Sequence, residues 1–203
     1  ADYNNHRIQR FDRNLNFVST LVNDTSRELR LQFGFPVAVA YSRFGEIFIA
    51  ELEHNRILKF DINGNPVQSF GDYDWGAGSL EEPVQIGISG KDAIFVADAM
   101  RKAVIKFDYY GNYLQEFPLD DFTSLDAIAV SSGYLFALDA RKQRIFVLTT
   151  DGELLTDFLL DSGLPAKDPA SNGLDIAIAG KMLYILDGAA GVIQCFHLQK
   201  SGR

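Results

Sequence analysis

The chain has 203 residues, 47% of them apolar and 12% aromatic, which is enough to bury a sizeable core. Its formal net charge of −8 opposes contact with phosphate groups and so disfavours a nucleic-acid partner. No apolar run approaches the ~18 residues that a membrane span needs, and a single cysteine, Cys195, cannot form an internal disulfide. Cysteine usage leaves the compartment undecided. Our working expectation is an exported protein.

The predicted elements, taken in chain order, are short apolar runs that are rich in β-branched and aromatic residues and bounded by turn residues. This pattern is typical of antiparallel strands. The first two runs are 7–11 and 17–21, and a polar loop follows at 22–35. Three units of four runs each come next, at 36–70, 83–117 and 125–158. The last unit, at about 174–198, has three runs.

The units share a motif that repeats along the whole chain. An acid ends the second run of every unit, at Asp2, Glu51, Asp98, Asp139 and Asp187. Successive acids are 41 to 49 residues apart, and a third apolar run follows each of them. A period in the forties with several strands per period is typical of a β-propeller in which each repeat forms one blade.

The most regular unit closely resembles an NHL repeat. The segments that carry the resemblance are 36–40 (PVAVA), 47–51 (IFIAE), 55–57 (NRI) and 60–61 (FD). The residues that match the second half of the repeat in the first unit are Asp2, Asn4, Asn5, Arg7, Ile8, Phe11 and Asp12. The resemblance covers almost the whole chain and implies an all-β fold, an NHL-type β-propeller of four-stranded antiparallel blades.

We interpret residues 1–203 as one propeller domain that is incomplete at both ends, with repeats at about 1–21, 36–70, 83–117, 125–158 and 174–198. A propeller closes with whole blades, since an open edge strand invites aggregation. The two terminal units do not add up to one shared blade. We therefore expect a part of a six-bladed ring of about 280 residues, with a five-bladed ring closed by overlapping ends as the alternative.

In a propeller the first strand of each blade lines the central channel. The loops between strands two and three and the loops between blades share one face, called here the top face. As a recognition surface this face would use aromatic and arginine anchors, and the alternative is a set of solvated loops with weak local ion pairs. The predicted binding residues are Tyr73, Trp75, Arg101, Lys102, Arg141, Lys142, His54 and Arg56.

The acids that end the second strands recur in every unit, so a repeated structural role explains them better than catalysis or calcium binding. Each can accept hydrogen bonds from nearby backbone N–H groups or pair with an arginine that follows it. The expected pairs are Asp2–Arg7, Glu51–Arg56 and Asp139–Arg144. We expect these acids to hold neighbouring blades together.

The first strands differ from one another where they approach the channel. Gln85 and Asp175 stand where other units have alanine, and Asp126 lies one residue earlier in its own unit. Two carboxylates near the axis could hold Ca²⁺ or act as an acid–base pair. The alternative is that they bind channel water or a backbone N–H group of a neighbouring blade. Apart from that Ca²⁺, we predict no metal or cofactor.

Other catalytic chemistries find little support. The resemblance implies one route, because some NHL-type propellers are lyases that hold a catalytic zinc through channel histidines. Here His6, His54 and His197 fall in loops or in an outer strand, which disfavours a zinc site. The sequence also lacks a G-x-S-x-G nucleophile elbow and a glycine-rich phosphate loop after a strand.

The sequence therefore favours a non-catalytic platform that binds a protein or a glycan through the top-face loops. The alternative is a metal-dependent lyase or hydrolase with its site in the channel, near Asp126 and Asp175. RNA binding, which the NHL resemblance also suggests, is disfavoured by the net charge. The residues that could still form a local basic patch are Arg101, Lys102, Arg141, Lys142 and Arg144.

Overall fold

The computed structural model describes residues 1–22, 34–72, 76–90, 93–119, 121–131, 133–160, 175–188 and 191–198. In these ranges the chain forms seventeen β-strands and one short 3-10 helix, η1 (Tyr3–Asn5). Nothing helical in these ranges has the length and hydrophobicity of a membrane span.

The strands form five sheets, which we call blades 1 to 5 in chain order. Blade 1 consists of β1 (Arg7–Phe11) and β2 (Phe17–Val22). Blade 2 consists of β3 (Pro36–Tyr41), β4 (Ile47–Glu51), β5 (Arg56–Phe60) and β6 (Pro66–Phe70). Blade 3 consists of β7 (Pro83–Ile88), β8 (Ile94–Asp98), β9 (Ala103–Phe107) and β10 (Tyr113–Pro118).

Blade 4 consists of β11 (Ala127–Ser131), β12 (Tyr134–Asp139), β13 (Arg144–Thr149) and β14 (Leu154–Leu159). Blade 5 consists of β15 (Asp175–Ala179), β16 (Met182–Asp187) and β17 (Val192–His197). Within each blade every strand pairs antiparallel with its neighbour in the chain.

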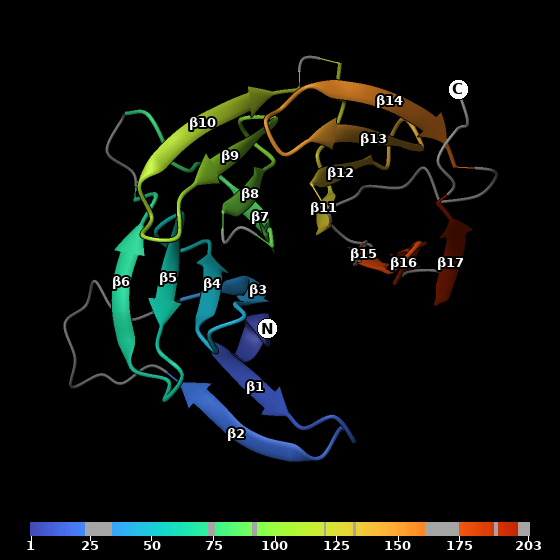
Figure 1. Ribbon diagram of the computed structural model, residues 1–203. Coiled ribbons are helices and arrows are strands. Elements are labelled where there is room, and N and C mark those ends of the chain that lie inside the picture. Colours follow the sequence, from blue (N-terminus) through green and yellow to red (C-terminus); the bar gives the residue numbers. More distant parts are fainter. Residues whose placement is uncertain are drawn as a thin grey trace.

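The five blades follow one another around an arc (Figure 1). Strands β3, β7, β11 and β15 lie nearest the centre of the arc, and β6, β10 and β14 lie at its outside. This arrangement confirms the predicted all-β fold of antiparallel blades in a propeller. The number of blades in the intact ring remains a prediction.

The turns between third and fourth strands are fixed by a repeated aspartate. In blade 2, Asp61 Oδ1 accepts hydrogen bonds from the backbone N–H groups of Asn63 (2.9 Å) and Asn65 (2.7 Å), and Oδ2 accepts one from Asn65 Nδ2 (3.0 Å). The bond from the Asn65 side chain is the largest of several that lower the pKa of Asp61. Asp12 and Asp108 make the same contacts in blades 1 and 3, so one local motif builds three hairpins.

The hydrophobic core lies between the blades. Every residue of β4, β5 and β8 is buried, since both faces of a middle strand are covered by adjacent blades. Phe48 of blade 2 and Phe107 of blade 3 belong to one cluster, and Phe95 of blade 3 and Phe146 of blade 4 belong to the next. Burial at the seams between blades therefore holds the arc together.

A phenylalanine near the end of β6 and one near the end of β10 also pack on a turn glycine of the following blade. A Cβ atom on Gly111 would lie 2.6 Å from Cδ1 of Phe70, and one on Gly152 would lie 2.5 Å from Cδ1 of Phe117. Both glycines have positive φ, 80° and 90°. These two positions need glycine for the backbone conformation and for space.

Candidate functional site

Four turns of one backbone conformation lead from the repeated acid to the third strand of blades 1 to 4. They span residues 2–7, 51–56, 98–103 and 139–144, and we call them the top-face turns. The fifth residue of each has positive φ: His6 at 48°, Asn55 at 51°, Lys102 at 50° and Gln143 at 53°. Because the turns match in length and conformation, their side chains can be compared position by position.

The acid at the first position is engaged by the protein itself. The carboxylate of Asp98, which is fully buried, accepts hydrogen bonds from the backbone N–H groups of Glu81 (2.7 Å), Glu82 (3.1 Å) and Arg101 (3.1 Å). Asp139 likewise accepts from the N–H groups of Thr123 (2.6 Å) and Lys142 (2.9 Å). Burial opposes ionisation of Asp139, but these hydrogen bonds outweigh it and lower its pKa.

These contacts support a structural role for the acids and correct two details. Glu81–Glu82 directly precedes β7, so Asp98 ties its strand to the loop that enters its own blade. For Asp98 and Asp139 the expectation that the acids join neighbouring blades is therefore wrong, because their hydrogen bonds end in their own blade and in the loop that enters it. Asp2–Arg7 and Glu51–Arg56 pair as expected, both at 2.7 Å. The third expected pair does not form, because Arg144 pairs with Asp157 on β14.

The third position of the turn behaves in the opposite way. It is exposed in all four top-face turns, and it carries a different side chain in each of them: Asn4, Glu53, Met100 and Arg141. Met100 is 65% exposed although it is apolar. One geometry therefore presents an acid that the protein itself engages and a variable exposed group; the acid is buried in blades 2 to 4 and partly buried in blade 1. Arg141 was a predicted binding residue and Met100 was not, although the register of the repeats places both at this position.

Two of the predicted binding residues are occupied by ion pairs within their blade. The Arg56 side chain is only 3% exposed and donates to Glu51. Arg101 is 21% exposed and lies 2.7 Å from Glu116 and 3.5 Å from Glu81, and the hydrogen bond to Glu116 is the main cause of its raised pKa. Both arginines serve the fold.

The remaining basic candidates are exposed. Lys102, Arg141 and Lys142 lie in the top-face turns of blades 3 and 4, which are adjacent. The Lys142 ammonium donates to the backbone carbonyl of Asp121, which leaves its charge without a counter-ion among the described residues. His54 is half exposed and contacts Glu51 through Nδ1 (2.9 Å). Tyr73 and Trp75 lie outside the described residues.

The channel candidates separate into a pair and a single residue. Gln85 on β7 donates from Nε2 to Oδ1 of Asp175 (2.5 Å) and accepts at Oε1 from the N–H of Ile128 on β11 (2.7 Å). This one side chain connects blades 3, 4 and 5. The bond to a backbone N–H group of a neighbouring blade, expected for Asp126 and Asp175, is thus made by Gln85, whereas the backbone N–H groups that the two carboxylates accept belong to their own blades. Neither repeat period nor residue type indicated that Gln85 and Asp175 would meet, because blades 3 and 5 are not adjacent.

Asp126 is held away from that pair. Its Oδ2 accepts hydrogen bonds from Ser124 Oγ (2.6 Å) and from the backbone N–H of Ala140 (2.8 Å) in the top-face turn of blade 4. Burial raises the pKa of Asp126, and these two bonds offset the effect only in part. Arg141 lies close enough to favour the ionised carboxylate.

One group of potential metal ligands was not anticipated. Single ligand atoms of Glu51, Glu53 and His54 lie within 4.8 Å of one another. However, Glu51 Oε1 already accepts from Arg56 Nε (2.7 Å), and Oε2 accepts from the backbone N–H of Glu53 (2.9 Å). A cation would have to displace a buried arginine, so this group does not fit a metal site.

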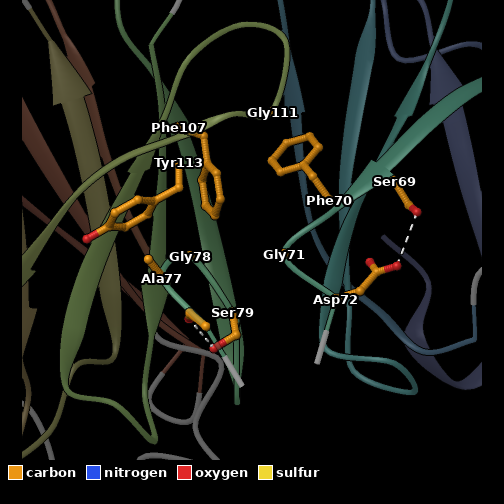
Figure 2. Close-up of a pocket in the computed structure, with 11 residues that line it drawn as sticks. Ser69, Phe70, Gly71, Asp72, Ala77, Gly78, Ser79, Phe107, Gly111 and Tyr113 are labelled. Atoms are coloured by element: carbon orange, nitrogen blue, oxygen red, sulfur yellow. Dashed lines mark hydrogen bonds between the residues drawn. The ribbon is translucent and has the colours of Figure 1, made fainter. Parts of the chain in front are cut away.

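A pocket of about 340 Å³ opens at the rim between blades 2 and 3, and Figure 2 shows its lining. The residues that line it are Ser69, Phe70, Gly71, Asp72, Gly76, Ala77, Gly78, Ser79, Phe107, Gly111 and Tyr113. Small residues dominate on the connecting segment, and Asp72 supplies the single charged side chain of this lining. None of the predicted site residues that the structure describes lines the pocket, and we assign it no function.

The sequence matches no protein-family profile and no curated protein. Among solved structures, a virginiamycin B lyase from Staphylococcus aureus is similar over 97% of this chain, with a TM-score of 0.64 and 18% identity. BamB from Moraxella catarrhalis is similar over 95%, with a TM-score of 0.57 and 14% identity. The WD40 repeats of RRP9 are similar over 80%, with a TM-score of 0.59 and 9% identity.

The chain spans 64%, 53% and 51% of the length of those three structures. At such low identities the likeness shows a propeller fold and nothing narrower. The NHL relationship inferred from the repeats remains a prediction.

Proposed function

We propose that this protein is a non-catalytic platform that binds a protein partner through the top-face turns of blades 3 and 4. The main support is the contrast within each turn between an acid that the protein engages in every one of these blades and an exposed third residue that changes. Repeated contacts that build the blade have no reason to vary, whereas a recognition surface needs different chemistry at equivalent places. Met100 and Arg141 are the third residues of the two turns concerned.

The chemistry of these two turns suits a protein surface. Methionine is flexible and polarisable, so it adapts to irregular apolar partners, and arginine is enriched at interface hot spots. A glycan was an equal expectation from the sequence. The two turns, 98–103 and 139–144, contain no aromatic residue on which a sugar ring could stack, which favours the protein partner.

An enzyme with its site in the channel is the second candidate, because a carboxyl group with a raised pKa is characteristic of acid–base sites. Asp126 has this property. A Ca²⁺ in the channel would belong to this candidate. Asp175 would be its other carboxylate, but Oδ1 of Asp175 already accepts from Gln85 and from the N–H of Ile176 (2.8 Å). This occupation of Oδ1 is the reason why we rank the channel second.

The test is a cross-linking capture with purified protein and an extract of the source cells. We expect Met100→Asp combined with Arg141→Asp to abolish capture of the partners bound by the wild type. The matched control is Leu15→Asp combined with Arg13→Asp, which changes one exposed apolar and one exposed basic residue of blade 1. Partners that survive the first variant, or that the control also loses, would refute a binding surface on blades 3 and 4.

A further inference from the structure

We infer that the partner segment held by blades 3 and 4 is acidic; this inference rests on the proposed function. The cations of the top-face turns differ in whether a carboxylate of the protein neutralises them. Arg56 and Arg101 lie against carboxylates of their own blade and contribute little to the outer field. Lys102 and Arg141 are exposed, and neither forms an ion pair within the described residues, although Arg141 lies close enough to Asp126 to favour its ionised form.

The exposed cations are grouped on two neighbouring turns. Lys102, Arg141 and Lys142 belong to two adjacent turns, and Met100 stands in the same turn as Lys102. The only side-chain hydrogen bond that these three cations make to described residues ends on the uncharged carbonyl of Asp121. Three positive charges thus lie on two turns of adjacent blades, one of which also carries the exposed Met100, in a chain whose net charge is −8.

The top-face turns of blades 1 and 2 differ from those of blades 3 and 4 in charge. The same turn positions carry Asn4 and Asn5 in blade 1, and Glu53 and His54 in blade 2. Within the four top-face turns, cations without a paired carboxylate among the described residues therefore lie in blades 3 and 4, and a partner's carboxylates gain most there. Complementary charge of this kind orients a partner and speeds its association, and both effects weaken as salt screens them.

A nucleic acid is the other polyanion that such charges could attract. Its backbone would extend past the cations toward Glu81, Glu82 and Asp121, which repel phosphates. The two turns also offer no aromatic ring on which a base could stack. A short acidic segment with an apolar residue uses the cations and Met100 and needs no aromatic ring.

The experiment measures fluorescence anisotropy of a labelled peptide of repeated Glu-Glu-Leu at ~50 mM and ~500 mM salt. The probes for comparison are the same peptide with Gln for Glu and an oligouridylate of equal length. We expect the acidic peptide to bind at low salt, and we expect Lys102→Gln, Arg141→Gln and Lys142→Gln together to weaken it about tenfold. The matched control, Arg10→Gln, Arg13→Gln and Lys181→Gln, removes three exposed cations elsewhere and should change affinity less than about twofold.

Several results would overturn the inference. Equal binding of the Gln peptide would show that the protein does not recognise carboxylates. An equal loss of affinity in the control variant would show only a response to net charge. Tighter binding of the oligouridylate would assign the patch to RNA. If no acidic peptide binds while Met100→Asp with Arg141→Asp still abolishes capture, the platform stands and its partner is not acidic. If capture survives that variant, the proposed function itself fails.

Discussion

The contact between Phe70 and Gly111 gives the sharpest test of how the blades are joined. Replacing Gly111 with alanine adds a Cβ atom 2.6 Å from Cδ1 of Phe70, at a backbone φ of 80°. The left-handed backbone costs an L-residue about 1–2 kcal/mol, and forcing an extra methyl group into a packed seam costs about 1–3 kcal/mol. We therefore expect Gly111→Ala to lower the free energy of unfolding by about 2–5 kcal/mol.

Gly133 separates the two costs. Its φ is 87°, but a Cβ atom there meets no heavy atom within 4 Å. Gly133→Ala should therefore lose only the backbone term of about 1–2 kcal/mol. The difference between the two variants, about 1–3 kcal/mol, measures the clash with Phe70.

The assay is urea unfolding followed by tryptophan fluorescence and circular dichroism, with the slope against denaturant compared between variants. A double-mutant cycle completes it, because Gly111→Ala should cost less in a Phe70→Ala background, where the clashing ring is absent. Equal destabilisation by Gly111→Ala and Gly133→Ala, or no coupling to Phe70, would falsify the view that this ring locks blade 2 onto blade 3.

Three further predictions concern the acids and the channel. Asp98→Ala should cost about 3 kcal/mol in urea unfolding because it leaves three part-buried N–H groups without their acceptor, whereas Met100→Ala should stay within about 0.5 kcal/mol; similar losses would contradict the division between building and binding positions. The pKa of Asp126 is raised in the folded state, so the wild-type protein loses folding stability as pH rises through that folded pKa. Urea unfolding of the wild type and of Asp126→Asn between pH ~3 and ~7 should therefore show the wild type becoming less stable relative to the variant as pH rises. A parallel profile for both proteins would show that burial of Asp126 has no such effect. Gln85→Leu should increase amide hydrogen exchange in β15, since blade 5 loses its contact with Gln85; unchanged exchange would mean that the contact does not stabilise blade 5.

The sequence predicted the fold well because each blade repeats its own local chemistry. The turn at Asp61 and the positive-φ glycine at 64 are local features, and the acid of each second strand keeps its place in the repeat. Period and turn residues were therefore sufficient to place the blades. The contact between Gln85 and Asp175 could not be predicted, because it depends on how far the arc curves between blades that are not neighbours.

The binding residues were predicted less well, and one carboxylate per outer strand explains why. Glu116 on β10 and Asp157 on β14 occupy equivalent places in blades 3 and 4, and each neutralises one cation. In blade 3 that cation is Arg101 of the top-face turn; in blade 4 it is Arg144, which begins β13 where blade 3 has alanine. Because Asp157 pairs with Arg144 at the start of β13, Lys142 in the turn stays exposed. Charge alone marked these residues as equal candidates, and only the pairing across the outer hairpin shows which of them can meet a partner.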